Sequence, residues 1–304
     1  MNPSSKIVLG LWPIAGVTTV GVTDSDARET IRTAIDGGVT MFDTAYSYGY
    51  DGESDRLLSE FVSGDPDRFF VMGKVGQRYT VDRDRAVDGS ASQLTADAEE
   101  HLRRLKLEQI DLLYLHQPDP DVALEVSAGA MLKLKERGLC KSVGICNATT
   151  EQIRQFADIA GCAAIQCPLN LIQRDSLQTT IAPTAARGIG SYVFWTLMKG
   201  LLAGKITRDH QFAKGDSRPN YPIFQGEQRR KAHDIVDRLG QIGEQTGKTI
   251  AQLSIGWAIS QPGVAGALVG ARRPDQIAET VDATELSSDV LSEIDEEVKQ
   301  HFPW

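Results

Sequence analysis

The chain has 304 residues, of which 41% are hydrophobic and 24% are charged, as is typical of a globular protein. Its net charge of −9 and pI near 5.1 argue against a nucleic-acid-binding surface, which would need a basic patch. No apolar run approaches the roughly 20 residues of a membrane span, and the N-terminus does not resemble a secretory signal. We therefore expect a cytoplasmic protein without nucleic-acid or membrane partners.

Short apolar runs alternate with amphipathic helical patterns along the whole chain. In the first half, strands are expected at 6–11, 39–43, 69–74 and 110–116, and helices at 25–38, 53–63, 94–105 and 122–137. In the second half, strands are expected at 142–146, 163–167, 191–195 and 265–270. Helices are expected there at 149–158, 178–187, 227–246, 249–260, 274–283 and 288–301.

Eight strand-plus-helix units of this kind predict an α/β fold, a single (β/α)₈ TIM barrel formed by one domain at 1–304. The strands are continuously apolar, as expected when both faces of a parallel sheet are covered. An extra C-terminal helix and long loops over the C-terminal face complete the prediction. The competing fold, a doubly wound open sheet, usually has G-x-G-x-x-G after its first strand, and that motif is absent. The long segment 207–227 is interpreted as a functional loop.

The four cysteines are Cys140, Cys146, Cys162 and Cys167, and each lies in or beside an apolar segment. We expect them to be buried, because a chain of this length rarely depends on a disulfide framework. No convergent histidines or carboxylates accompany them, so no metal site is predicted.

Ionisable residues end three consecutive predicted strands: Asp43, Lys74 and His116. Tyr48 follows Asp43 in the loop over the same rim. Each residue alone has an ordinary explanation, as a turn cap, a solvated lysine or a core histidine. A barrel, however, points all of them at one pocket.

The residue types suit proton exchange with a carbonyl or alcohol oxygen. A free tyrosine has a pKa of about 10, and an adjacent ammonium lowers it. Lys74 is expected to do this for Tyr48, with Asp43 holding the ammonium charged and His116 hydrogen-bonding the reacting oxygen. Such a site suits hydride transfer to a carbonyl.

Three segments, "FDTAYSYG", "MGKVG" and "IDLLYLHQPDP", make the chain resemble the aldo-keto reductase family over nearly its whole length. The resemblance implies NADPH-dependent reduction of an aldehyde or ketone, or the reverse oxidation of an alcohol. It also implies that Asp43, Tyr48, Lys74 and His116 form the catalytic tetrad.

The stretch "VGARRPDQIAET" at 269–280 places Arg272 and Arg273 at a predicted helix start, where the helix dipole disfavours cations. A bound phosphate would offset this, and two solvated arginines are the alternative. The resemblance implies that Gly270, Arg272, Gln276 and Glu279 lie near the adenosine end of the cofactor. The arginines favour NADP(H) over NAD(H).

The resemblance also implies a nicotinamide and diphosphate end, in which Phe194 stacks on the nicotinamide; a one-residue shift would give that role to Trp195. Cys146 stands where the family has Ser. The remaining implied cofactor residues are Trp12, Asn147, Gln166, Leu197, Gly200 and Leu202.

Two other functions remain open at this point. Lys74 could form a Schiff base in an aldolase-type lyase, or the chain could sense NADPH with little turnover. The partner expected in the main hypothesis is a small carbonyl or alcohol substrate. Its pocket could be lined by Trp12, Tyr48, Tyr50, Phe224 and Trp304.

Overall fold

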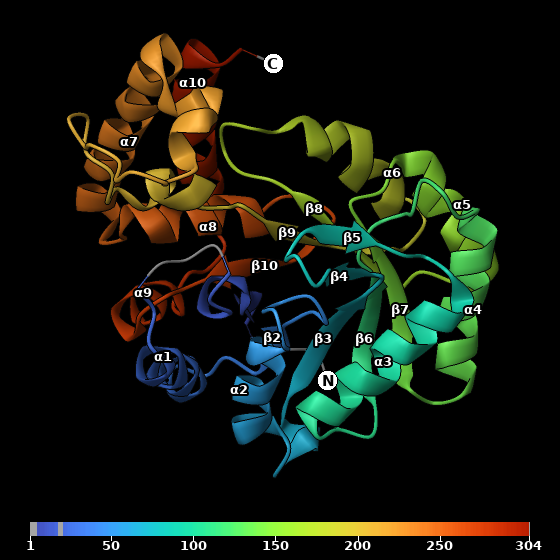
Figure 1. Ribbon diagram of the computed structural model, residues 1–304. Helices are drawn as coiled ribbons and strands as arrows, with labels where there is room; N and C mark the ends of the chain where they lie inside the picture. The colour runs from blue at the N-terminus through green and yellow to red at the C-terminus, as the bar shows by residue number, and fades with distance from the viewer. Residues whose placement is uncertain (1–4, 18–20, 304) are drawn as a thin grey trace.

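Eight parallel strands hydrogen-bond in the order β1-β10-β9-β8-β7-β6-β3-β2 and close into a barrel (Figure 1). The structure is a computed structural model, and it describes residues 5–17 and 21–303. The barrel strands are β1 (Ile7–Gly10), β2 (Met41–Asp43), β3 (Phe70–Val75), β6 (Ile110–Leu115), β7 (Cys140–Cys146), β8 (Ala164–Pro168), β9 (Gly190–Phe194) and β10 (Val264–Gly270). The predicted (β/α)₈ TIM barrel is therefore confirmed.

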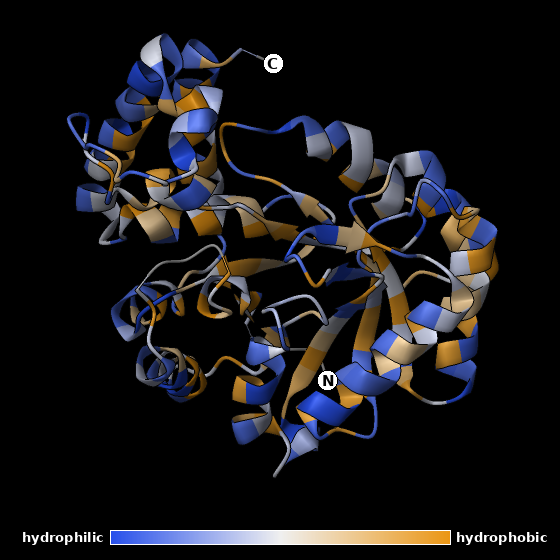
Figure 2. Ribbon diagram, viewed as in Figure 1, coloured by the Kyte–Doolittle hydropathy of each residue, from blue (hydrophilic) through white to orange (hydrophobic). Residues whose placement is uncertain are grey.

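Helices connect the parallel strands, which cannot be joined by tight turns. They are α1 (Asp24–Asp36), α2 (Glu53–Val62), α3 (Ala91–Leu105), α4 (Leu124–Glu136), α5 (Thr150–Ala160), α6 (Ala182–Ala185) and α8 (Ile250–Ile259), while α9 (Pro274–Thr280) follows the last strand. Three of them, α1, α5 and α8, begin with a threonine capping box, which satisfies the first backbone N–H groups. Figure 2 shows hydrophilic residues on the outward helix faces and hydrophobic residues along the strands.

Two further helices lie outside the barrel repeat, α7 (Gly226–Thr246) and the predicted C-terminal helix α10 (Ser288–His301). They pack side by side at one corner of the molecule (Figure 1), where Arg238 of α7 donates to Glu293 of α10 at 2.6 Å. Segment 207–227 leads into α7 and contains two short 3₁₀ turns, Arg218–Asn220 and Pro222–Phe224.

The segment 76–90, where no strand or helix was predicted, contains a small antiparallel hairpin. Strands β4 (Gln77–Tyr79) and β5 (Arg85–Val87) pair there, and the turn is closed by Thr80 N–H donating to the Asp84 carbonyl at 2.8 Å. The strands are three residues long and mostly polar, so they lack the hydrophobic alternation that reveals a strand in a sequence.

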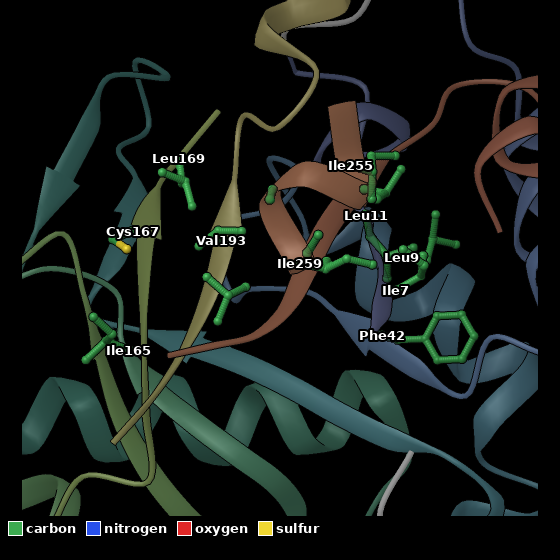
Figure 3. Close-up of a cluster of buried hydrophobic side chains, with 14 of the residues drawn as sticks. Ile7, Leu9, Leu11, Phe42, Ile165, Cys167, Leu169, Val193, Ile255 and Ile259 are labelled. Atoms are coloured by element: carbon green, nitrogen blue, oxygen red, sulfur yellow. The ribbon is translucent and has the colours of Figure 1, made fainter. Parts of the chain in front are cut away.

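Residues of the barrel strands alternate between two cores, because successive side chains point to opposite faces. Figure 3 shows Ile7 and Leu9 in the outer core beside Phe42. The inner core contains Val8, Met41, Met72, Leu112, Tyr114, Cys146, Ala164 and Leu268. Two residues beyond Met41, Met72 and Tyr114 come Asp43, Lys74 and His116. The same alternation therefore places these three polar residues on the inner face, at one end of the barrel.

Among the described residues, no helix is both long and apolar enough to cross a membrane.

Candidate active site

A buried ion pair joins the ends of β2 and β3. The Lys74 ammonium hydrogen-bonds the Asp43 carboxylate, and the two side chains are 2% and 1% exposed. The other Asp43 oxygen accepts the amide of Gln166 from β8 at 2.5 Å. The predicted contact between Asp43 and Lys74 is present, and both carboxylate oxygens have a donor, as a buried charge requires.

Lys74 also reaches the two groups that follow Asp43 in the chain. Its ammonium donates to the Thr44 carbonyl at 3.2 Å and to the Tyr48 hydroxyl at 3.0 Å. Ser54, the second residue of α2, fixes the loop that carries Tyr48, because its hydroxyl donates to the Tyr48 carbonyl at 3.0 Å. The ammonium thus has a directed contact to each neighbour, and Tyr48 is the tyrosine of 41–54 that it bonds.

The Lys74 proton is held firmly. Burial alone would lower the pKa of Lys74, but the Asp43 carboxylate and the Tyr48 hydroxyl raise it above its ordinary value. Burial raises the pKa of Asp43, and this is opposed by the charge and hydrogen bond of Lys74 and by Gln166. Lys74 is therefore an ammonium at neutral pH, which is unsuitable for a Schiff-base nucleophile.

The expected lowering of the Tyr48 pKa is wrong for this arrangement of the chain. Burial raises the pKa of Tyr48 to about 12, although the nearby Lys74 ammonium acts in the opposite direction. The reason is that desolvation disfavours the phenolate more than the ammonium favours it. Tyr48 therefore carries its proton at neutral pH, which is the form that a proton donor needs.

His116 follows β6, and its backbone N–H continues the ladder to Val75 at 2.9 Å. Its ring lies 6.0 Å from the Tyr48 ring, centroid to centroid. Burial lowers the pKa of His116 well below its ordinary value, and the charges of Lys74 and Arg85 lower it further. The imidazole is therefore neutral and can hydrogen-bond an oxygen placed beside Tyr48.

Three residues hydrogen-bond His116 or Asp43 in contacts that the sequence did not indicate. Ser47 lies 3.5 Å from His116 Nδ1, and Asn147 donates its side-chain amide to the His116 carbonyl at 3.0 Å. Gln166, assigned above only to the cofactor, is a partner of Asp43. Ser47 lies in the segment "FDTAYSYG", but its position there does not predict a contact with His116.

The segment 270–280 has an asymmetric pair of arginines. Arg273 forms an ion pair with Asp275 at 3.1 Å, whereas no described carboxylate pairs with the exposed guanidinium of Arg272. The Arg272 backbone N–H is fixed by the side chain of Gln276 at 2.8 Å. Glu279 pairs with Lys205 at 3.2 Å. Arg272 is the arginine of this segment that has its charge available for an anion.

Gly270, at the end of β10, meets the loop after β1. A Cβ atom on Gly270 would lie 2.7 Å from Pro13 Cγ, so a larger residue would displace that loop. Gly270 is therefore needed for the close packing of Pro13 against the end of β10.

The turn after β9 has an unusual backbone. Met198, Lys199 and Gly200 have φ values of 43°, 54° and 95°, a left-handed run that is strained at its two non-glycine positions. Leu197 is partly buried against the outer core beside this turn, whereas the Leu202 side chain is fully buried in that core. The turn exposes backbone rather than the leucine side chains.

The two aromatic candidates for the nicotinamide differ in their place relative to β9: Phe194 is its last residue, and Trp195 comes after it. Phe194 packs against the inner core, on the face that holds Lys74, while the neighbouring Val193 belongs to the outer core. Trp195 follows the end of β9, is 45% exposed and has a φ of 63°, which is outside the strand conformation. The packing of Phe194 against the inner core therefore favours it over the exposed Trp195.

Two pairs of aromatic rings involve residues expected to line the substrate pocket. The Trp12 ring lies 5.1 Å from the Tyr48 ring, and Tyr50 lies 4.9 Å from Tyr79 of β4. Phe224 instead is buried in the outer core, with its ring against Phe212 at 5.5 Å. Trp304 lies outside the described residues.

The cysteines are unsuited to nucleophilic chemistry in this fold. Burial raises the pKa of Cys140, Cys162 and Cys167 to about 12, and it raises the pKa of Cys146 well above the ordinary value. Since the thiolate is the reactive form, all four side chains are expected to be unreactive.

Comparisons with known proteins agree with this geometry. A model of the Aldo/keto reductase family matches residues 6–299. The chain is 31% identical over 277 residues to "Aldo-keto reductase YhdN" of Bacillus subtilis (strain 168), covering 90% of this chain and 83% of that relative. It is 28% identical over 258 residues to "Probable aldo-keto reductase 1" of Glycine max, covering 84% of this chain and 74% of the relative.

A solved structure of similar shape is the glycerol dehydrogenase AKR11B4 from Gluconobacter oxydans. It matches with a TM-score of 0.91 and 30% sequence identity, covering 99% of this chain and 93% of that one. Both the family model and the overall shape thus extend over nearly the whole sequence. The chain therefore belongs to the aldo/keto reductase family.

Proposed function

We propose that this protein, acting as one domain, reduces an aldehyde or ketone to the alcohol with NADPH, or catalyses the reverse oxidation, and that Tyr48 exchanges the proton. Membership of the family implies carbonyl reduction with a nicotinamide cofactor. The observation that carries the finer proposal is the buried chain of contacts from Asp43 through Lys74 to the Tyr48 hydroxyl.

The four residues have distinct roles in this proposal. Tyr48, protonated at neutral pH, donates its proton to the substrate oxygen as that oxygen gains negative charge. The Lys74 ammonium then stabilises the phenolate, and Asp43 keeps the ammonium in place. Neutral His116 hydrogen-bonds the same oxygen and sets its direction.

The nicotinamide cofactor, when bound, supplies the hydride that reaches the carbonyl carbon. Phe194 and Asn147 would hold its nicotinamide end, and the backbone of Met198–Ala203 would lie along its diphosphate. Arg272 fits the adenosine phosphate, because its exposed guanidinium has no carboxylate partner among the described residues, whereas Arg273 is paired. This asymmetry supports a preference for NADP(H), with Gly270, Gln276 and Glu279 shaping the same end.

The two alternatives have less support. A Schiff-base lyase needs a neutral amine, and Asp43 holds Lys74 as an ammonium. A sensor with little turnover would not need Tyr48, Lys74 and His116 brought to one place at the mouth of the barrel.

The test is single-turnover reduction of 4-nitrobenzaldehyde with NADPH, followed by cofactor absorbance. Tyr48→Phe removes the proton but little volume, so cofactor binding should persist while the rate falls on the order of 10²–10⁴-fold. Tyr46→Phe is the matched control, since its ring stacks on Arg104 and it should keep the wild-type rate. A near wild-type rate in Tyr48→Phe would exclude Tyr48 as the proton donor. Binding of NADPH without turnover by the wild type would favour the sensor.

A further inference from the structure

Arg83 and Arg85 of the β4–β5 hairpin lack the carboxylate partner that most described arginines of this chain have. Of the described arginines, those without an ion pair to a carboxylate are Arg68, Arg83, Arg85, Arg229 and Arg272. Asp82 and Asp84 alternate with Arg83 and Arg85 in the sequence, yet neither forms an ion pair with them. The hairpin therefore presents two exposed guanidinium groups whose charge is not neutralised by direct contact.

Both arginines stack on the aromatic rings at the mouth of the active site. Arg85 lies 5.4 Å from the Trp12 ring centre and donates to the Tyr79 hydroxyl at 3.3 Å. Arg83 lies 4.5 Å from the ring of Tyr50. Stacking holds a guanidinium in place, and the N–H groups of Arg85 that do not bond Tyr79 are left for contact with an anion.

The guanidinium group of Arg85 is close to the proposed proton donor, Tyr48. The centre of the Trp12 ring lies 5.1 Å from the centre of the Tyr48 ring and 5.4 Å from the Arg85 guanidinium carbon, so one ring contacts both the proton donor and the guanidinium. The charge of Arg85 also contributes to lowering the pKa of His116, so its field reaches the position where the substrate oxygen would lie. A small molecule bound beside Tyr48 and His116 can therefore also reach Arg85.

We propose that the substrate is a carbonyl compound with an anionic group, carboxylate or phosphate, which Arg85 binds with help from Arg83 while the carbonyl lies against Tyr48 and His116. The proposal rests on the proposed function and specifies its substrate class. A guanidinium offers two parallel N–H donors that match either anion. Because Arg85 lies beside Trp12, it binds the end of the substrate that does not react.

The experiment compares matched aldehydes with and without the anion, using NADPH. The carboxylate arm sets 4-carboxybenzaldehyde against its methyl ester, and the phosphate arm sets glyceraldehyde 3-phosphate against glyceraldehyde. We expect the wild type to have the higher kcat/KM for the anionic member of at least one pair. The arm in which this preference is larger identifies which anion is recognised.

The variants separate charge recognition from packing against Trp12. Arg85→Gln should reduce kcat/KM for the anionic aldehyde, mainly through KM, by on the order of 10–100-fold more than for its neutral match. Arg85→Lys should restore part of this difference because it keeps the charge. The control is Arg68→Gln, another arginine without a carboxylate partner, which stacks on Phe69 at 5.1 Å and should change neither substrate.

The outcomes distinguish the two proposals. If the neutral aldehydes are reduced but neither anionic partner is preferred, or if Arg85→Gln lowers both members of a pair equally, the anionic substrate class is wrong and the reductase remains. If the wild type reduces none of the four compounds nor 4-nitrobenzaldehyde, the proposed function itself is wrong.

Discussion

Replacing Lys74 by Met should destabilise the protein as well as stop catalysis. The Asp43 carboxylate is 1% exposed, and without the ammonium its remaining side-chain donor is the Gln166 amide at 2.5 Å. Removing one partner of a buried ion pair typically costs about 3–5 kcal/mol, because the other charge is left uncompensated. We expect a loss of this size in the free energy of unfolding near neutral pH.

The loss should depend on pH in a defined direction. Burial raises the pKa of Asp43 in the folded protein, and removing Lys74 takes away the charge that opposes this rise. A group with a raised folded pKa stabilises the fold below its unfolded pKa, about 3.9 for Asp, and this stability is lost as pH rises through the folded pKa. Lys74→Met should therefore differ least from the wild type at low pH and increasingly as pH rises.

Urea unfolding followed by circular dichroism from about pH 5 to about pH 8 measures this difference. The double variant Asp43→Asn with Lys74→Met removes both charges and should recover much of the loss, with little pH dependence from this site. Arg137→Met is the control, because Arg137 and its partner Glu99 are 49% and 52% exposed, and it should lose about 1 kcal/mol or less. A loss in Lys74→Met no larger than this, or one independent of pH, would refute the reasoning.

Three other changes test further features of the structure. Arg272→Ala should weaken NADPH binding by about 1.5–3 kcal/mol in a fluorescence titration with little effect on NADH, while Arg273→Ala should have the smaller effect; equal losses for both cofactors would argue against a phosphate contact. The buried thiols of Cys140, Cys146 and Cys167 should react slowly with Ellman's reagent in the folded protein and rapidly in urea, with the half-buried Cys162 reacting first; fast labelling of all four without denaturant would contradict the burial of the other three. Asp55→Ala should cost at least about 2 kcal/mol in urea unfolding, because it removes the partner of fully buried His101 at 2.6 Å; Asp51→Ala, at an exposed position, is the control, and equal small losses would speak against the pair.

The order of the fold and the identity of the candidate catalytic residues could be predicted from local patterns. Continuous apolar strands and amphipathic helices indicated the barrel, and the positions of Asp43, Lys74 and His116 at strand ends predicted that they meet. This works because the two-residue alternation of a strand is a property of the backbone, so a residue two places beyond an inner-core position faces the same interior. The short hairpin at 77–87 was missed because its polar strands have no such pattern.

The tertiary structure decided the quantities that depend on distance and burial. Tyr48 beside Lys74 predicted a lowered phenol pKa, but the depth of the site reversed its direction, since desolvation depends on every element packed around the hydroxyl. Arg272 and Arg273 are equivalent in the sequence, and only the fold pairs one of them with Asp275. Arg85 stood in an unremarkable polar segment until the hairpin placed it on Trp12. Contacts between residues far apart in the chain create these differences, and no local periodicity encodes them.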